Sequence, residues 1–321
     1  MRLSIVSTMY ASAPYLEEFH RRATAAARDL TDGYEVVYVN DGSPDDSLEI
    51  ALGLMAEDPK VRIVDLSRNF GHHKAIMTGC AHARGDLVFL IDCDLEEPPE
   101  DLLTLHQVME RERADMVYGV QESRKGGPVE RFTGGIFYRV YNRLAAVQVP
   151  PNVLTMRLMS RRYVRSLIRH RDHEIYLLGL MCITGYKQVA VPVSKSSRHA
   201  TSYSLTRRIA MATTAVTTFS TKPLTWMFQI GAVISVLSVL AATCISVRRI
   251  LYGTTEIGWA SLIVSIWLVG GMLMLGIGIL GLYLGRVMSE VKDRPYTIVR
   301  QVYSHEPHER HGEDGEQGGP K

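Results

Sequence analysis

The chain has 321 residues, a formal net charge of +2 and 46% hydrophobic residues. This length suits one catalytic-sized domain with an appendage and excludes a long array of domains. The near-balanced charge predicts no nucleic-acid partner. No CxxC pair or zinc-type spacing links the cysteines, which fits a reducing compartment; they are Cys80, Cys93, Cys182 and Cys244.

Short apolar runs alternate with helical patterns over the first 120 residues or so. We expect helices at about 16–30, 45–55 and 72–83, between strands at 3–7, 35–39, 61–65 and 87–91. Strands that alternate with helices in this way predict an α/β domain with a mostly parallel sheet.

Acidic residues follow two of these strands, Asp41 after the second and Asp92 and Asp94 after the fourth. Ligands bind open α/β sheets at the carboxyl ends of the strands, so this edge is the candidate site. For Asp41 a plain turn that caps the next helix is the alternative.

Asp92, Asp94 and Glu96 place three carboxylates within five residues at the end of a buried strand. Like charges grouped in this way are costly unless a cation neutralises them. Mg²⁺ or Mn²⁺ prefers oxygen ligands and would also hold a diphosphate. If the backbone stays extended, the three side chains project to one side.

An acidic helix start is the alternative for part of this segment, because two prolines and further acidic residues follow. We assign Glu97, Glu100 and Asp101 to that helix start. His72 and His73 receive a similar interpretation as residues at the start of a helix rather than metal ligands.

Residues 226–247 and 257–285 contain no charged side chain, and about 20 apolar residues suffice to cross a bilayer. We therefore expect two transmembrane helices in a hairpin. Basic residues on both flanks predict cytoplasmic chain ends and an integral protein of a bacterial inner or plasma membrane. Before the hairpin, an amphipathic helix is expected on the membrane surface, with a core helix as the alternative.

An ordered set of motifs resembles the family 2 glycosyltransferases, in particular their polyprenyl-phosphate branch. The resemblance reaches to about Arg300 and rests on Asn40-Asp-Gly-Ser-Pro-Asp-Asp46, Ser67-Arg-Asn-Phe-Gly71, Asp92-Cys-Asp-Leu-Glu-Glu-Pro-Pro-Glu100, Phe137-Tyr-Arg139, Arg157-Leu-Met159 and Phe219-Ser-Thr-Lys-Pro-Leu224.

The resemblance implies a GT-A fold, a UDP- or GDP-linked sugar donor and a polyprenyl phosphate acceptor such as undecaprenyl phosphate. It implies that Asp41 contacts the nucleobase and that Asp92 and Asp94 hold a metal-diphosphate. The implied site residues are Thr8, Tyr10, Asp41, Ser43 and Asp92 for the nucleotide, Asp92, Asp94 and Glu96 for the metal, and Asp94, Arg131, Arg157 and Arg198 for catalysis.

These motifs and spans together predict a domain organisation; whether the chain forms a homo-oligomer is left open. The expected parts are a catalytic domain at 1–203, a juxtamembrane helix at 204–222, the two spans within 223–286, and a cytoplasmic tail at 287–321 that is disordered after about 303.

The sequence departs from the family pattern at four positions. Ala11 and Ser12 replace the usual Asn-Glu after the first tyrosine, Glu96 replaces a glutamine, Thr155 replaces an aspartate, and Ser202 replaces a lysine. An acceptor phosphate is already a dianion at neutral pH and hardly needs a general base, so loss of the carboxylate at 155 is compatible with activity.

We expect inverting transfer by a single displacement. A processive polysaccharide synthase is the second enzyme interpretation, but its Gln-x-x-Arg-Trp motif is missing from the sequence. A catalytically impaired nucleotide-sugar-binding scaffold in the membrane is the alternative from another class.

Overall fold

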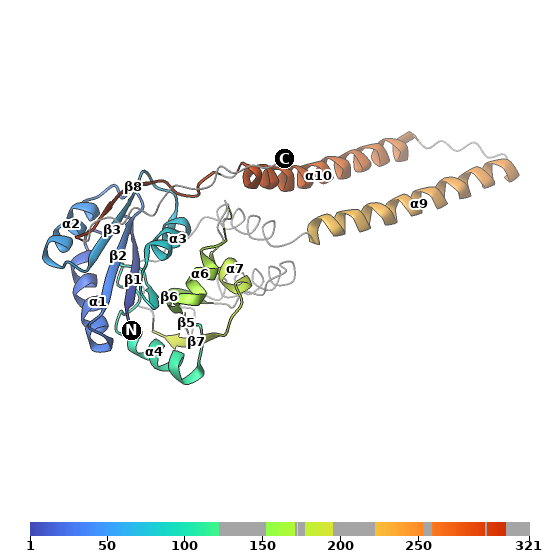
Figure 1. Cartoon of the computed structure of the whole chain (residues 1–321). Coiled ribbons are helices and arrows are strands. Elements are labelled where there is room, and N and C mark those ends of the chain that lie inside the picture. The colour runs from blue at the N-terminus through green and yellow to red at the C-terminus, as the bar shows by residue number, and fades with distance from the viewer. Residues whose placement is uncertain are drawn as a thin grey trace, which may run out of the picture. The chain divides into compact units, whose positions relative to one another are not determined.

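The computed structural model describes residues 1–121, 152–170, 172, 177–194, 222–252, 259–292 and 294–305 (Figure 1). The chain divides into two compact units. The first combines residues 1–126, 150–201 and 295–321, and the second combines 127–149 and 202–294. We describe each unit by itself.

A mixed sheet forms the centre of the first unit, in the order β7-β5-β6-β4-β1-β2-β3-β8. The strands β1 to β4 run parallel to their neighbours among themselves, whereas β6 and β8 pair antiparallel with β4 and β3. The strand bounds are β1 Leu3–Met9, β2 Tyr34–Asn40, β3 Val61–Leu66, β4 Leu87–Leu90, β5 Met116–Gln121, β6 Val153–Ser160, β7 Gln188–Val193 and β8 Val299–Tyr303.

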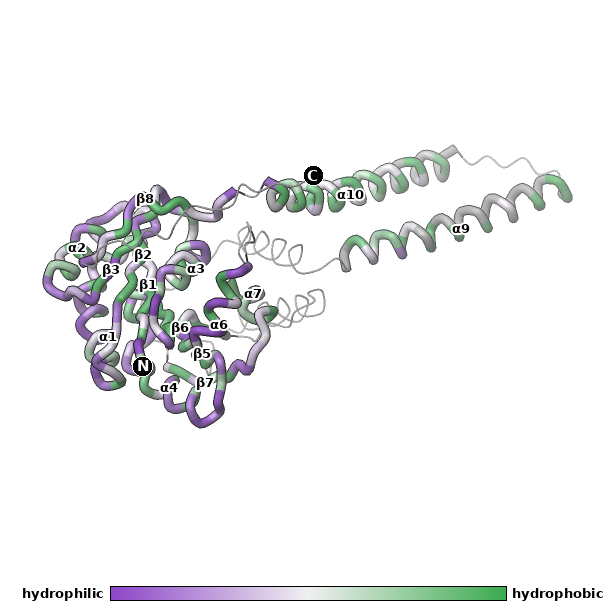
Figure 2. The backbone as a smooth tube through the Cα atoms, viewed as in Figure 1, coloured by the Kyte–Doolittle hydropathy of each residue, from purple (hydrophilic) through white to green (hydrophobic). Residues whose placement is uncertain are grey.

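The parallel strands are buried on both faces, which explains their nearly continuous β-branched and aromatic runs. Every residue of β1, β2 and β3 is buried, and Figure 2 shows hydrophobic residues along β2 and β3. The first four strands and the helices between them confirm the predicted α/β class. The helices of this unit are α1 Leu16–Leu30, α2 Ser47–Glu57, α3 His72–His82, α4 Asp101–Glu112, α6 Arg161–Leu167 and α7 Leu177–Ile183.

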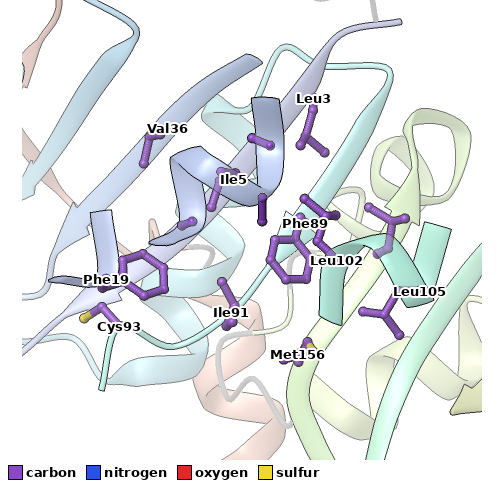
Figure 3. Close-up of a cluster of buried hydrophobic side chains, with 14 of the residues drawn as sticks. Leu3, Ile5, Phe19, Val36, Phe89, Ile91, Cys93, Leu102, Leu105 and Met156 are labelled. Atoms are coloured by element: carbon purple, nitrogen blue, oxygen red, sulfur yellow. The ribbon is translucent and has the colours of Figure 1, made fainter. Parts of the chain in front are cut away.

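One hydrophobic cluster lies between the sheet and helices α1 and α4 (Figure 3). Alternation along β1 sends Leu3 and Ile5 into this cluster and Val6 to the opposite face. Each fully buried leucine, isoleucine or phenylalanine contributes about 1.5–3 kcal/mol. The members of the cluster that Figure 3 labels are Leu3, Ile5, Phe19, Val36, Phe89, Ile91, Cys93, Leu102, Leu105 and Met156.

Helix α3 covers the opposite face of β1 and β2 at unusually short range. A Cβ atom at Gly79 would lie 2.5 Å from Val6 Cγ1 and 2.9 Å from Val39 Cγ2. Only glycine therefore fits at this point of the helix. The close approach sets how near α3 lies to β1 and β2.

The C-terminal strand β8 was not expected from the sequence. It adds to the free edge of β3, with Ile63 opposite Tyr303 and Val64 opposite Val302. Beside it, Ser67 N donates to Ile298 O at 2.9 Å. Residues close to the C-terminus thus complete the sheet that the first residues begin.

The second unit contains two long helices, α9 Lys222–Tyr252 and α10 Trp259–Val291. A Cβ at Gly276 of α10 would lie 3.2 Å from Met227 Sδ of α9, so the two helices approach closely at this point. The predicted juxtamembrane helix lies outside the described residues except for Lys222.

The predicted transmembrane hairpin and membrane location require correction. Within the part of the chain that the structure describes, no helix combines the length and the apolar character needed to cross a bilayer. The prediction was drawn from the absence of charged residues in the sequence, and the absence of charge does not by itself establish a membrane-spanning helix. This finding overturns the assignment to an inner membrane with cytoplasmic ends.

Candidate active site

The carboxyl ends of β1, β2 and β4 meet at one edge of the sheet. Thr8 of β1 lies opposite Val39 in the parallel register with β2, and Ile91, directly after β4, donates its N–H to Val6 O at 3.1 Å. This register brings Thr8, Asp41 and Asp92 to the same edge, as expected for strands that run in parallel.

His72 connects two of these residues. Its Nδ1 lies 3.1 Å from Thr8 Oγ1, and its Nε2 lies 3.5 Å from Asp92 Oδ1. The side chain of Asp92 is 26% exposed and that of His72 is 46% exposed, so the pair borders solvent. The sequence predicts only a helix start at His72, which the structure confirms. The contacts with Thr8 and Asp92 depend on the packing of α3 against the sheet, which the sequence does not reveal.

Asp41 holds the loop that leads into α3. Its two carboxylate oxygens accept hydrogen bonds from Phe70 N at 2.7 Å and Gly71 N at 3.0 Å. Burial raises the pKa of Asp41, and the two N–H donors offset that rise only in part. Asp41 is 2% exposed, so any contact with a nucleobase would use the lone pairs that these donors leave.

Ser43 and Asp45 fasten the loop between β1 and α1. Ser43 Oγ donates to Asp45 Oδ1 at 2.5 Å and accepts from Ala11 N at 2.7 Å, while Ala13 N donates to Asp45 Oδ2 at 3.0 Å. Ser43 therefore supports the loop that carries Tyr10. Tyr10 is 54% exposed. The Ser43 hydroxyl is already engaged within the protein.

The segment after β4 is a turn, not an extended strand. Asp94 Oδ1 accepts from Glu96 N at 2.9 Å, and Leu95 between them has φ +59°. Cys93 points inward, where its Sγ donates to Thr8 O at 3.1 Å. Burial raises the pKa of Cys93 to about 12, so this group stays a thiol.

Because this segment is a turn, the expectation that Asp92, Asp94 and Glu96 project to one side of an extended strand no longer holds. Among the residues that the structure describes, no group of three or more His, Cys, Asp or Glu side chains could hold a metal ion. Asp92 and Asp94 still fit Mg²⁺ or Mn²⁺ by chemistry, because Mg²⁺ is commonly bound by one or two carboxylates with waters and substrate phosphates. Glu96 is not needed for such a site.

The sequence predicted that Glu97 belongs to the start of a helix, but Glu97 lies before α4 and contacts β6 instead. It is 2% exposed, and its carboxylate accepts from Thr155 N at 3.1 Å and Met156 N at 2.7 Å of β6. Glu97 thus fastens the acidic segment to β6. The segment follows β4, and β6 is the antiparallel neighbour of β4.

Arg157 is buried beneath this edge and directs its donors at the protein. Nε donates to Thr155 O at 2.8 Å and Nη2 to Leu154 O at 2.6 Å, while Nη1 contacts Met181 Sδ. Burial lowers the pKa of its guanidinium. These contacts suit a residue that supports β6 better than one that grips a phosphate. The other two arginines predicted for catalysis, Arg131 and Arg198, lie outside the described residues.

Known proteins that are similar to this chain are named as glycosyltransferases. The model of the family described as "Glycosyl transferase family 2" matches residues 4–168. A protein of Mycobacterium tuberculosis named "Putative glycosyltransferases" is 48% identical over 94% of this chain and 89% of its own length. The "Prophage bactoprenol glucosyl transferase homolog" of Escherichia coli K12 is 31% identical over 94% of this chain and 99% of its own.

The solved structure "Mannosyltransferase PcManGT from Pyrobaculum calidifontis in complex with GDP-Man and Mn2+" is similar over 91% of this chain and 86% of its own, at 15% identity and a TM-score of 0.48. The family match spans the strands whose ends form the candidate site, and the relatives extend over nearly the whole chain. The chain therefore belongs to glycosyltransferase family 2, and its mixed α/β sheet is GT-A-like.

Proposed function

We propose that the protein transfers one sugar from a UDP- or GDP-linked donor to a polyprenyl phosphate, such as undecaprenyl phosphate, with inversion at the anomeric carbon. The product is a lipid-linked monosaccharide. Relatives named bactoprenol glucosyl transferase, at 30–31% identity over nearly their whole length, support this class of acceptor.

The observation that carries the proposal is the meeting of Thr8, Asp41 and Asp92 at one edge of the sheet. Three strand ends supply the polar groups, and the Asp92 side chain remains partly open to solvent. In α/β sheets this edge binds nucleotides and their phosphates. A donor that lies across it would place its base near Asp41 and its diphosphate near Asp92.

The acceptor makes modest chemical demands on the protein. A phosphate monoester has a second pKa of about 6 and is a dianion at neutral pH, so it can attack without a general base. The residues of the site then have to orient donor and acceptor in line and exclude water. A bound Mg²⁺ or Mn²⁺ would neutralise charge on the departing diphosphate. Asp92 and Asp94 are the residues that would hold it.

A catalytically impaired protein that binds a nucleotide-sugar is the second candidate. The polar groups of Arg157 and Ser43 form hydrogen bonds within the protein. Their engagement leaves fewer groups for the donor. The two candidates differ in turnover but not in binding, so a transfer assay separates them.

The test is transfer of radiolabelled sugar from a panel of UDP- and GDP-sugars to undecaprenyl phosphate by the purified full-length protein, with and without Mn²⁺ or Mg²⁺. We expect a lipid-linked product that requires metal and disappears in Asp94→Asn. Glu110→Gln, on the exposed end of α4, is the matched control and should keep full activity. Nucleotide binding without product from any donor would support the impaired binding protein instead.

A further inference from the structure

We infer that His72 is a positioning residue for Asp92, and that its ring orients the Asp92 carboxylate toward a divalent cation bound with the donor diphosphate. This inference rests on the proposed function. It starts from a three-residue chain, Thr8–His72–Asp92, which joins the end of β1, the start of α3 and the end of β4.

The two ring nitrogens of His72 face partners with different hydrogen-bonding abilities. The Asp92 carboxylate can only accept a hydrogen bond, so a ring that carries its proton on Nε2 suits the contact with Oδ1 at 3.5 Å. In the neutral ring Nδ1 is then an acceptor, and it faces the Thr8 hydroxyl at 3.1 Å. One tautomer of the neutral ring therefore suits both the Thr8 contact and the Asp92 contact.

The arrangement leaves part of Asp92 available for a ligand. Asp92 Oδ1 makes the contact with the imidazole, and the Asp92 side chain remains 26% exposed. His72 itself suits a supporting role better than direct ligation, because Mg²⁺ and Mn²⁺ prefer oxygen ligands. Groups that hydrogen-bond a metal ligand fix its orientation, and their loss commonly weakens metal binding 10–100-fold.

Packing of α3 keeps His72 in this place. Gly79 allows the helix to approach Val6 and Val39 closely, and Asp41 accepts from Gly71 N directly before the helix begins. The start of α3 is therefore held both by the sheet and by the loop after β2. A side chain on this first turn is preorganised relative to the end of β4.

The experiment measures binding rather than turnover. Wild type, His72→Ala and His72→Gln are titrated with Mn²⁺ at saturating UDP or GDP, with free Mn²⁺ followed by electron paramagnetic resonance. The same proteins are titrated with the nucleotide without metal. His82→Ala, which removes an imidazole from the other end of the same helix, is the matched control.

We expect His72→Ala to weaken Mn²⁺ binding about 10-fold or more, with metal-free nucleotide binding changed less than about twofold. His72→Gln places an amide donor near the position of Nε2 and should recover part of the loss. His82→Ala should bind like wild type. His72 is 46% exposed on its side chain, so both substitutions should leave thermal unfolding almost unchanged.

Three results would overturn the inference. Unchanged or tighter Mn²⁺ binding in His72→Ala would show that the ring does not orient the ligand. An equal loss of metal-free nucleotide binding would make His72 a direct nucleotide contact. Failure of the wild type to bind Mn²⁺ with either nucleotide would remove the proposed function together with this role.

Discussion

Arg300 of the C-terminal strand donates from Nη1 to Asp65 Oδ2 at 3.2 Å, and so joins β8 to a carboxylate that is 1% exposed. Asp65 Oδ1 in turn accepts from Asn40 Nδ2 at 2.7 Å, and Asn40 Oδ1 accepts from Ser43 N at 3.0 Å. A continuous polar chain therefore runs from the edge strand to the loop after β2, which carries Asp41.

Arg300→Ala should destabilise the first unit by about 1–2 kcal/mol, because it leaves the buried Asp65 carboxylate with one donor fewer. The value lies at the low end for buried carboxylates because the arginine side chain is 58% exposed. Denaturant unfolding measures the change. In a double-mutant cycle, Asp65→Asn should reduce the effect of Arg300→Ala; fully additive losses would show that the two residues are not coupled.

Asp45→Asn should lower stability at neutral pH by about 1–2 kcal/mol and flatten the acid limb of the stability curve. The hydroxyls of Ser43 and Ser47 and two backbone N–H groups bond to the carboxylate and lower the pKa of Asp45 to about 2, against the opposing effect of burial. A folded-state pKa below the unfolded value stabilises at higher pH, and this contribution is lost as pH falls from about 5 toward 2.

Urea midpoints between pH 7 and pH 3 test this expectation. The wild type should lose more stability than Asp45→Asn across that range. Parallel curves for the two proteins would mean that Asp45 has the same pKa in the folded and unfolded states.

Gly79→Ala should destabilise by about 1–3 kcal/mol, because its Cβ would meet Val6 and Val39 at less than 3.0 Å. Val6→Ala in the same chain should recover part of the loss. Gly53→Ala in α2 is the matched control, since a Cβ there meets nothing within 4 Å, and it should stabilise by about 0.5–1 kcal/mol. A loss at both glycines would point to helix effects unrelated to packing.

Glu97→Ala should cost about 2–4 kcal/mol, because the N–H groups of Thr155 and Met156 lose their acceptor in a buried place. Glu97→Gln keeps one carbonyl oxygen and should cost less. We also expect weaker donor binding, since the acidic segment is released from β6. Calorimetric unfolding and nucleotide titration of both variants check the two effects, and an unchanged melting temperature for Glu97→Ala would contradict the first.

The sequence predicted the parallel part of the sheet because its signals are local. Runs such as Tyr34–Asn40 are buried on both faces, and the acidic residues after β2 and β4 follow directly from strand order. The register of parallel strands then brings them to one edge without further information. Whether Thr8, Tyr10, Asp41, Ser43, Asp92 and Asp94 bind a nucleotide and metal remains a prediction.

The rest depended on contacts between distant segments. Strand β8 pairs with β3 across more than 200 residues of chain, and the partners of Glu97 and Arg157 are set by tertiary packing. Leucine rarely adopts positive φ, so the turn at Leu95 gave no warning that Asp92, Asp94 and Glu96 would not line up. Counting charges alone also led to the incorrect membrane location.

The position of β8 has a consequence for biosynthesis. A ribosome releases β1 to β4 long before it has made Val299–Tyr303, and the two long helices are synthesised in between. Until then the edge of β3 has unpaired backbone groups in a strand whose six residues are all buried in the finished protein. Such an edge invites pairing with other nascent chains. Quality control of this protein should therefore act most strongly on molecules whose translation stops before residue 299.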